Sequence, residues 1–309
     1  MPNHALSPAA RRIFHLAGMA ASVLATLRRY DNLDALEPYW ALLNAHCSDF
    51  TIYFWCTCAV STLALFGGSL AFALLDAIPV LRKYKIQPTR PPTVGLYLRC
   101  LKLAVINHLF IHMGLLITNI PLMEYLGIAV SGPLPKPSTL AVQFVVCMLC
   151  EDFLFYWSHR FLHHKKIYKY VHKVHHEYQA PFGLTAVYTH PFEELLTTGA
   201  MMAGPLLVCR HMLPIWLWMT YRIIETIDSH SGFDFPWSPM HAIPFGSGVA
   251  RHDFHHEKFD SVFGSQFAFW DWLCGTDAAF RVLQRQKAAN GEKATLDIFD
   301  AFAPKAKTL

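Results

Sequence analysis

The 26 residues from Phe50 to Leu75 contain no charged side chain, and this run limits more than any other feature how the chain can fold. A helix of about 20 apolar residues crosses the hydrocarbon core of a bilayer, so the run is long enough to span a membrane. The composition agrees, because 53% of the residues are hydrophobic and only 16% are charged. The sequence therefore predicts an integral membrane protein.

Two further apolar segments, at about residues 103–123 and 139–157, are also long enough to be transmembrane helices. A longer apolar stretch, residues 195–227, is interrupted near its middle by Arg210 and Pro214. This pattern predicts a helical hairpin whose two ends lie on one side of the membrane. We expect an all-α fold: a membrane bundle of about three spans plus the hairpin, with a helical cytosolic cap.

The domain organisation follows from these segments. Residues 1–49 show no cleavable signal peptide, and an interfacial helix is one interpretation of them. Residues 50–157 form the transmembrane part, and residues 158–277, with the hairpin, form a histidine-rich domain that we expect to be catalytic. Residues 278–309 form a cytosolic tail, whose last five residues resemble the dilysine retrieval signal of the endoplasmic reticulum.

The basic residues predict the orientation. The connector after the first span and the residues near it carry six of them, and the loop after the second span carries only Lys136. The positive-inside rule places the connector in the cytosol, so the segment after the third span faces the cytosol as well. The six basic residues are Arg82, Lys83, Lys85, Arg90, Arg99 and Lys102.

Several functional classes are excluded. The 26 Lys and Arg residues form no long basic run with interleaved aromatic residues, so no nucleic-acid surface is expected. Most of the eight cysteines lie in apolar runs, which argues against a disulfide framework, and Cys147 and Cys150 are expected to pack rather than bind metal. No G-x-G-x-x-G follows a strand, so reducing power must come from a partner protein.

Histidine is concentrated in one part of the chain, because 13 of the 18 histidines lie within the 98 residues from His159 to His256. Three clusters, HRFLHH, HKVHH and HDFHH, place imidazoles three and four residues apart, which is one face of a helix. Neutral imidazole binds iron or zinc, whereas gathered imidazolium ions would repel one another. The clusters therefore predict a metal centre with these candidate ligands: His159, His163, His172, His175, His176, His252, His255 and His256.

The number of imidazoles distinguishes between metals. A structural zinc ion takes four ligands, often thiolates, whereas this chain offers at least eight imidazoles and no nearby cysteine. A site for two metal ions fits that number better. Two iron ions can activate O₂ and zinc has no redox chemistry, so we expect oxidation of the hydrocarbon part of a lipid.

The chain resembles the fatty acid hydroxylase/sterol desaturase superfamily, and within it the C-4 methylsterol oxidase branch. The family hallmark is H-x₃-H(H), H-x₂-H-H and H-x₂-H-H around a di-iron site. The likeness covers most of residues 151–277. One departure is that the family usually reads A-E-Y before its H-P pair, where this chain has Ala186, Val187 and Tyr188. The likeness is carried by EDFLFYWSHRFLHHKKIYKYVHKVHHEYQAPFGL, YTHPFEE, ETIDSHSGFDFPW, IPFG and RHDFHHEKFDSVFGSQFAFWDWLCGTD.

This resemblance implies an enzyme of the endoplasmic reticulum membrane that oxidises the 4α-methyl group of a sterol stepwise to a carboxylate. It implies two iron ions, O₂ as co-substrate, and electrons from NAD(P)H delivered through cytochrome b5 and its reductase. Other enzymes of sterol C4 demethylation are expected as further partners. The resemblance also adds His190 of the H-P-F-E motif and His230 of the H-S-G motif to the candidate ligands.

Acidic residues near the histidines are candidates for orienting the ligands, because a ligating imidazole commonly donates its other N–H to a carboxylate. Asp152 is the preferred candidate, about two helical turns before His159, with an interfacial acid as the alternative. His108 and His112, in the second span, either line the substrate path or are satisfied within the bundle. The other candidate acids are Glu193, Glu194, Glu225, Asp228, Asp253 and Glu257.

Two alternatives stay open at this point. One keeps the di-iron chemistry and changes the lipid, as in a sphingolipid or fatty acid hydroxylase or a sterol C5 desaturase. The other is a non-catalytic membrane protein that binds metal. Sterol analysis distinguishes the first alternative from sterol C4-methyl oxidation, and metal analysis tests the second.

Overall fold

The structure is a computed structural model that describes residues 31–243 and 245–295, and within that part of the chain it contains helices and no strand beyond isolated bridges. Three helical segments are long and apolar enough to cross a membrane: Thr51–Asp76, Val94–Tyr125 and Pro137–Leu162. The all-α membrane bundle is thereby confirmed. The second and third spans extend beyond the apolar segments that predicted them.

The first two spans each combine several helical elements. The first contains α3 (Thr57–Thr62) and α4 (Gly68–Asp76), with π-helical stretches at Thr51–Cys56 and Leu63–Gly67. The second contains α5 (Val94–Ile106), a π-helical stretch at Asn107–His112, and α6 (Met113–Tyr125). A π-helical turn inserts an extra residue and is frequent at functional sites. The third span is the single helix α7 (Pro137–Leu162).

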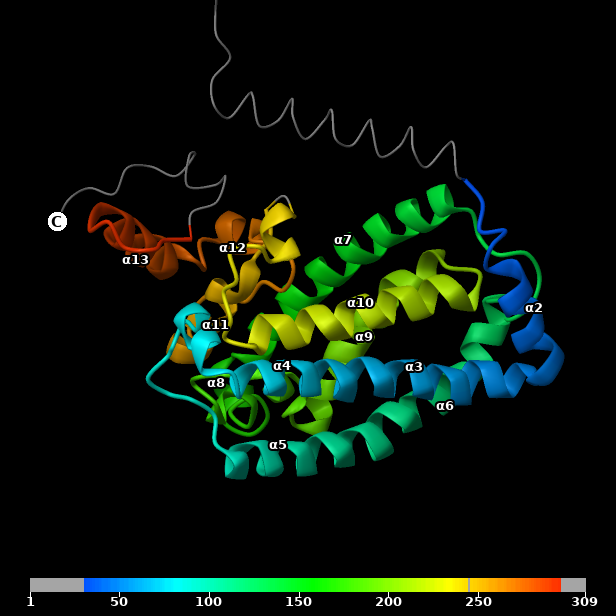
Figure 1. The fold of residues 1–309 in the computed structure, drawn as a ribbon, viewed down its shortest axis with the longest axis horizontal. Coiled ribbons are helices and arrows are strands. Elements are labelled where there is room, and N and C mark those ends of the chain that lie inside the picture. Colours follow the sequence, from blue (N-terminus) through cyan, green and yellow to red (C-terminus); the bar gives the residue numbers. More distant parts are fainter. Residues whose placement is uncertain (1–30, 244, 296–309) are drawn as a thin grey trace, which may run out of the picture.

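The remaining α-helices lie before, between and after the spans. Figure 1 shows α8 and α11 together at one end of the bundle, with α12 and α13 toward the same end and α2 at the opposite end. We call the end with α8 and α11 the histidine end and the other the α2 end. These helices are α2 (Glu37–His46), α8 (Lys165–Tyr168), α9 (Pro191–Val208), α10 (Met212–His230), α11 (Gly248–Lys258), α12 (Phe269–Cys274) and α13 (Ala278–Ala289).

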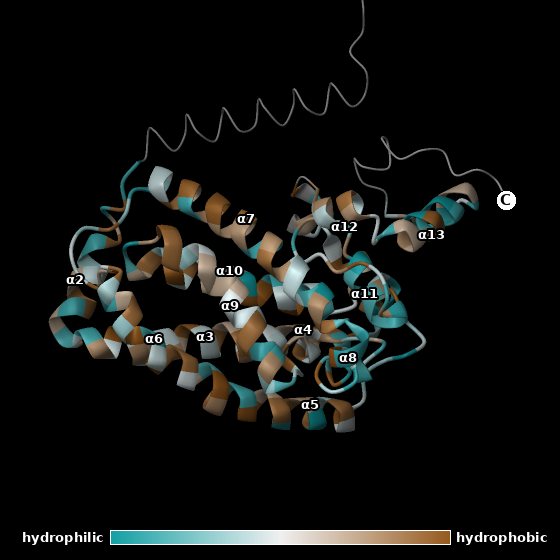
Figure 2. Ribbon diagram, turned by 180° about the vertical axis from the view of Figure 1, so that it is seen from behind, coloured by the Kyte–Doolittle hydropathy of each residue, from teal (hydrophilic) through white to brown (hydrophobic). Residues whose placement is uncertain are grey.

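The three spans expose apolar side chains to their surroundings. Only 28%, 33% and 17% of the residues in their most apolar windows are buried inside the protein, in chain order. Figure 2 shows hydrophobic residues along these long helices and hydrophilic residues around α8 and α11. Such a surface is stable in lipid and unstable in water, so this is a membrane protein.

The predicted hairpin at residues 195–227 is confirmed as α9 and α10, which meet at residues 209–211. At this turn the amide of Ala129 donates to the carbonyl of Arg210, and the amide of Met212 donates to the carbonyl of Ala129, each at 3.0 Å. Ala129 belongs to the loop between the second and third spans. The hairpin therefore runs from the histidine end to the opposite end of the bundle, about 27 Å for the 18 residues of α9.

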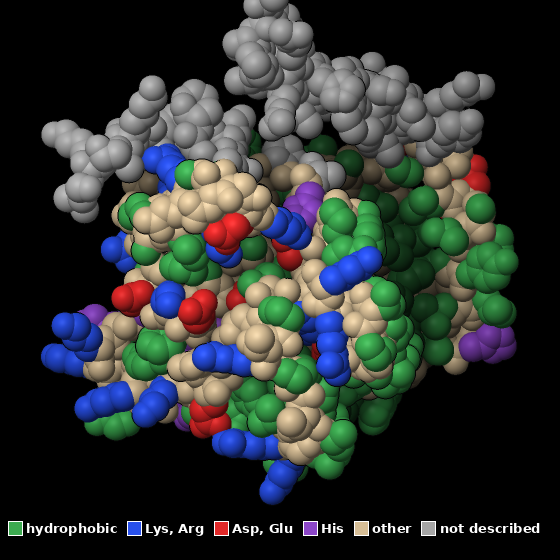
Figure 3. Space-filling view, turned by 60° about the vertical axis from the view of Figure 1, so that its left-hand side comes forward, with side chains coloured by type: hydrophobic (Ala, Val, Ile, Leu, Met, Phe, Trp, Pro, Cys, Tyr) green, Lys and Arg blue, Asp and Glu red, His purple; other side chains and the backbone are tan. Residues whose placement is uncertain are grey.

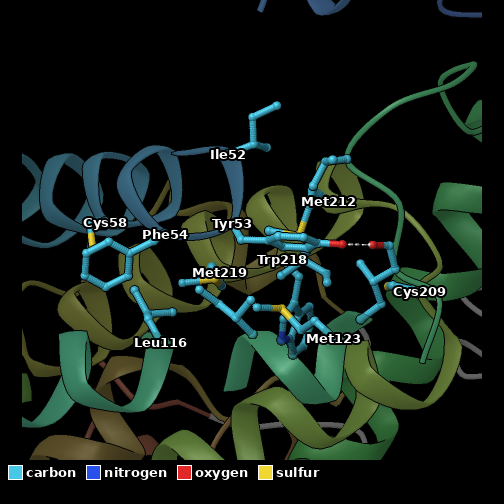
Figure 4. Close-up of a cluster of buried hydrophobic side chains, with 14 of the residues drawn as sticks. Ile52, Tyr53, Phe54, Cys58, Leu116, Met123, Cys209, Met212, Trp218 and Met219 are labelled. Carbon is cyan, nitrogen blue, oxygen red and sulfur yellow. Dashed lines mark hydrogen bonds between the residues drawn. The ribbon is translucent and has the colours of Figure 1, made fainter. Parts of the chain in front are cut away.

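A large apolar core fills the α2 end, and Figure 4 shows Tyr53 and Trp218 among methionine side chains in it. The Tyr53 hydroxyl donates to the carbonyl of Ile128 at 2.5 Å, and the indole of Trp216 donates to the hydroxyl of Thr57 at 2.8 Å. The core packs the first two spans against the hairpin at the α2 end. Most of the buried histidines lie at the opposite end of the bundle.

The basic connector between the first two spans packs at the histidine end. The amide of Ile86 donates to the carbonyl of Gly232 at 3.0 Å, and the Gln87 side chain donates to Asp253 of α11 at 2.9 Å. The connector and the histidines therefore lie at the same end of the bundle.

All eight cysteines are free thiols in the structure. The dilysine-like signal at residues 305–309 and the first 30 residues lie outside the described residues.

Close packing of α7 on α9 predicts a specific effect of substitution. A Cβ atom at Gly204 would lie 2.6 Å from the Cα atom of Cys147, which is backbone that cannot easily move aside. We expect Gly204→Leu to lower the free energy of unfolding by about 1–3 kcal/mol, as overpacking does, in denaturation of the detergent-solubilised protein.

Gly199 is the matched control, because it lies in the same helix and a Cβ atom there would meet nothing within 4 Å. Gly199→Leu should leave stability unchanged or raise it slightly, since leucine has the higher helix propensity. Equal loss of stability in both variants would contradict the close approach of the two helices.

Candidate metal centre

Nine of the ten candidate histidines come together at the histidine end, from four parts of the chain. The end of α7 supplies two, which share a face because they are four residues apart. The irregular segment after α8 supplies three, the last turn of α10 supplies one and α11 supplies three. In that order they are His159 and His163; His172, His175 and His176; His230; and His252, His255 and His256.

These histidines form two groups, in each of which one ring nitrogen per residue lies within 4.8 Å of all the others. Every member is buried except His163, which is partly buried. The first group consists of His159, His163, His172, His176 and His255, and the second consists of His175, His230, His252 and His256.

The spacing of the H-x-x-H-H motifs distributes the imidazoles between the groups. In the second cluster, the first and last histidines belong to the first group and His175 belongs to the second. In α11 the assignment is reversed, so that only His255 joins the first group. The adjacent rings of His175 and His176 are 5.6 Å apart between centroids. The two groups are therefore neighbours, as a two-metal site requires.

Backbone carbonyls fix which ring nitrogen of these histidines carries the proton. Because a carbonyl oxygen only accepts hydrogen bonds, an Nδ1 atom facing one is the donor, and the Nε2 atom of that ring keeps its lone pair. The pairs are His159 with Phe263 at 2.9 Å, His175 with Tyr188 at 3.4 Å, His230 with Thr226 at 2.7 Å, His255 with Ser261 at 2.8 Å and His256 with Tyr178 at 3.0 Å.

The Nε2 atoms of each group face one another. In the first group His172 lies 3.0 Å from His159 and 3.1 Å from His176, between Nε2 atoms. In the second group the Nε2 atom of His230 lies 2.8 Å from that of His252 and 3.2 Å from that of His175. Both Nδ1 protons of the His175–His230 pair are held by carbonyls, so the two facing Nε2 lone pairs of this pair repel. Nitrogen ligands about 2.1 Å from a metal ion and at right angles would be about 3.0 Å apart, so the groups fit metal ions.

Burial keeps these imidazoles neutral. It lowers the pKa of His163 to about 2 and that of His230 to about 4. Burial and repulsion by neighbouring imidazoles also hold six further pKa values well below the usual range: those of His172, His175, His176, His252, His255 and His256. The neutral form is the one that binds metal, so the groups are in their ligating state at pH 7.

Glu193 is the acid that lies beside a candidate ligand. Its Oε1 atom is 2.9 Å from Nδ1 of His172, and both side chains are buried. Burial raises the pKa of the Glu193 carboxyl well above its usual range, and the neighbouring Glu194 raises it further. A metal ion on His172 would supply the positive charge that favours the carboxylate.

Asp152, the preferred candidate in the sequence, has a different contact. Its Oδ1 atom accepts a hydrogen bond of 2.9 Å from the amide of Phe267, in the loop before α12. It therefore fixes a loop to α7, whereas Glu193 contacts a candidate ligand. The sequence placed Glu193 among several acids but carried no signal that set it apart, because the contact depends on how α9 packs.

His190 is the candidate ligand that the structure leaves outside both groups. Its Nδ1 atom accepts a hydrogen bond of 3.1 Å from the amide of Phe192 and so caps the start of α9. His164 likewise caps the start of α8, where its Nδ1 atom accepts from the amide of Lys166 at 3.4 Å. We therefore limit the proposed ligand set to the nine histidines of the two groups.

A partly open cavity lies beside the centre. Its volume is about 1030 Å³ when the space open to the surroundings is included. Histidines of both groups line it: His159 of the first, and His175, His230 and His252 of the second. Because these four side chains border one space, a molecule in the cavity would lie against both groups. The cavity also reaches the second span, where Asn107 contributes to its wall.

His108 and His112 line this cavity and are also hydrogen-bonded within the bundle, so the structure is compatible with each interpretation of them. Nε2 of His108 is 2.8 Å from the Thr62 hydroxyl, and Nε2 of His112 is 3.0 Å from the Ser61 hydroxyl. His112 and Met201 also line a second, more apolar cavity, which continues toward the core at the α2 end.

The two groups predict the metal content of the purified protein. We expect two metal ions per chain, measured by elemental analysis that includes iron and zinc. His172→Ala and His252→Ala each remove a candidate ligand from a different group, and the loss of that imidazole should lower metal affinity about 10- to 100-fold or more.

His190→Ala is the control, since His190 belongs to neither group. This variant should keep both metal ions. A wild-type protein with one metal ion or none, or equal metal loss in all three variants, would contradict the two-metal assignment.

Comparisons with known proteins agree with this geometry. The family model described as fatty acid hydroxylase matches residues 144–276, which contain all nine histidines of the two groups. Methylsterol monooxygenase 1 of Rattus norvegicus is 37% identical over 285 residues, 91% of this chain and 97% of the relative. The enzyme of the same name from Danio rerio is 38% identical over 248 residues, 79% of this chain and 85% of the relative.

A very-long-chain aldehyde decarbonylase of Oryza sativa subsp. indica is 36% identical over 250 residues, 80% of this chain and 94% of the relative. No solved structure matches the chain. The high coverage of the relatives, together with the family model over the histidine clusters, leads to one conclusion. The chain belongs to the fatty acid hydroxylase family, in which its relatives include the methylsterol monooxygenases of animals and plants.

Proposed function

We propose that the protein is a sterol C4-methyl oxidase, which uses O₂ to oxidise the 4α-methyl group of a membrane sterol stepwise. The observation that carries this proposal is the cavity lined by imidazoles of both groups and by residues of the spans. A lipid can enter such a cavity from the bilayer and place a hydrocarbon group against the metal centre. The names of the relatives favour a sterol.

The two groups of histidines are proposed to hold two iron ions, which would supply the activation of O₂ when bound. Imidazole suits iron, and the nine-nitrogen set exceeds what a closed four-ligand zinc site uses. The residues of this chain set the orientation and the protonation of the imidazole rings that would hold the iron ions. The carbonyls and Glu193 orient the rings, and burial keeps the rings unprotonated.

The side chains that line the two cavities suit a sterol, which is largely apolar. Apolar residues such as Leu65, Phe155 and Ile223 line the cavity beside the centre and would exclude water from a ring system. The second cavity, lined by methionines, would accept a flexible hydrocarbon tail, because methionine adapts to irregular shapes. Its methionines are Met123, Met201, Met202, Met212 and Met219.

The histidine end is proposed to face the cytosol at the endoplasmic reticulum, where it would receive electrons from NAD(P)H through cytochrome b5 and its reductase. Figure 3 shows this end, with Lys and Arg side chains spread across it. Such a surface attracts an acidic electron carrier and speeds its association. Exposed basic residues near the centre are Lys165, Lys166, Lys169, Lys173 and Lys258.

A strain that lacks its own sterol C4-methyl oxidase tests the proposed reaction. Expression of this protein should remove the accumulated 4-methyl sterols, as measured by mass spectrometry. Under ¹⁸O₂, the oxygen atom added to the methyl carbon should carry the label. His255→Ala, which removes a ligand of the first group, should abolish the conversion, whereas His190→Ala should retain it. Oxidation of fatty acyl, sphingolipid or aldehyde substrates without a sterol product would favour another lipid instead.

The basic surface predicts a charge effect that depends on the electron donor. Reversal of charge at Lys165, Lys166 and Lys169 should lower the initial rate with reduced cytochrome b5 about 10-fold at low salt. The rate with a small uncharged reductant should not change. Lys136→Glu is the control, because this exposed lysine lies at the other end of the bundle. Equal effects with both donors would contradict docking at this surface.

A further inference from the structure

One wall of the cavity beside the proposed metal centre carries three polar residues that are not candidate metal ligands: Asn107, Thr189 and Glu194. We propose that Glu194, with Asn107 and supported by Thr189, binds the hydroxyl group of the substrate and selects an alcohol over a ketone at that position. The inference rests on the proposed sterol oxidation. It assigns a specificity-determining residue to that reaction.

Glu194 has a carboxylate oxygen available for a ligand. Its Oε2 atom accepts a hydrogen bond of 3.0 Å from the Thr189 hydroxyl. Its Oε1 atom has no hydrogen-bond partner in residues 31–243 and 245–295. Protein surrounds the side chain, and the partly accessible carboxylate lines the cavity. The Thr189 contact fixes the carboxylate and leaves one oxygen for the ligand.

Asn107 provides a second acceptor in the same wall. Its side chain is only 2% exposed, and its Nδ2 atom donates to the carbonyl of Thr189 at 2.9 Å. Its Oδ1 atom has no hydrogen-bond partner among the described residues. A buried polar atom without a partner costs about 1–3 kcal/mol, so a donor group of a ligand would stabilise it. Asn107 also begins the π-helical stretch of the second span.

The polar wall lies next to the metal centre along the chain. The carbonyl of Tyr188 is 3.4 Å from Nδ1 of His175, and Oε1 of Glu193 is 2.9 Å from Nδ1 of His172. Thr189 and Glu194 are the next residues after these two. A sterol carries its hydroxyl on the ring carbon adjacent to the one that bears the 4-methyl group. The group that binds the hydroxyl must therefore line the same space as the centre that oxidises the methyl group, and Glu194 lines the cavity that four of the candidate ligands also line.

The chemistry of the wall selects the ligand. The Asn107 amide oxygen accepts hydrogen bonds whatever the charge of Glu194, and the Glu194 carboxyl group accepts them when it is ionised. Both groups then stabilise a hydroxyl, which donates, and disfavour a ketone, which only accepts. Glu151, the other acid that lines the cavity, is paired with Arg222 at 2.7 Å and is not available in the same way. Val187, which also lines the cavity, is apolar. Glu194 is therefore the acid of this lining that lacks a basic partner.

The test compares three forms of one 4,4-dimethyl sterol that differ only at carbon 3: the alcohol, the ketone and the 3-deoxy compound. The full-length, iron-loaded protein in lipid nanodiscs is assayed for kcat/KM and for equilibrium binding of each labelled sterol. Glu194→Gln should lower kcat/KM and binding of the alcohol about 10- to 100-fold, the effect of losing a hydrogen bond to a charged group. The values for the 3-deoxy compound should change less than about threefold, since it makes no such bond.

The variants also distinguish selectivity from a general defect. The amide nitrogen of a glutamine can donate to a ketone, so Glu194→Gln should shift the preference toward the ketone. Thr189→Val removes the support for the carboxylate and should cause a smaller shift in the same direction. Glu124→Gln, at an exposed acid near the end of α6, is the matched control and should leave all three values unchanged.

Two outcomes overturn the inference. An unchanged ratio of alcohol to 3-deoxy turnover and binding in Glu194→Gln, with wild-type activity on the alcohol intact, rejects this role and leaves the proposed function standing. An equal loss with all three sterols, or loss of iron and of thermal stability, assigns Glu194 a structural role instead. A wild-type protein that oxidises none of the sterols rejects the proposed function itself.

Discussion

Repulsion between neutral imidazoles is the constraint on which the rest of this structure depends. Carbonyl groups hold the Nδ1 protons of five of these histidines, and neighbouring Nε2 atoms within the two groups lie 2.8–3.3 Å apart. Without a cation, the facing lone pairs of His175 and His230 would repel one another in a buried site. The free energy of binding the proposed metal ions would therefore be part of the free energy of folding of this end of the bundle.

The two ends of the bundle differ in composition and in role. The α2 end is an apolar core that fixes the spans and the hairpin, whereas the histidine end collects polar side chains from α7, α10 and α11. A buried ionic network joins α7, α10 and the loop before α12 beside the cavity: Arg222 pairs with Glu151 at 2.7 Å and contacts Glu225, and Gln266 donates to Glu151 at 2.7 Å. Such networks are costly to form, and removing one partner leaves a buried charge.

The cavity brings residues of the spans and imidazoles of both groups together in one wall. In the proposed reaction, a substrate that enters between the spans would meet the centre without crossing water. Such a route would give a lipid-oxidising centre a reason to lie in a membrane bundle. The polar wall at Asn107, Thr189 and Glu194 supplies the few directional contacts that a mostly apolar pocket needs to orient its ligand.

The sequence by itself predicted the spans and most of the proposed ligand set, because both follow from local properties. A long uncharged run is typical of a span, and histidines four residues apart share a face of α7 and of α11. The second cluster is different, because His172, His175 and His176 lie outside the α-helices and divide between the two groups. Only the tertiary structure decided that His190 caps a helix, that Glu193 rather than Asp152 contacts a ligand, and how the imidazoles divide into two groups. These outcomes depend on packing between segments far apart in the chain. No local pattern encodes which side chain reaches which neighbour there.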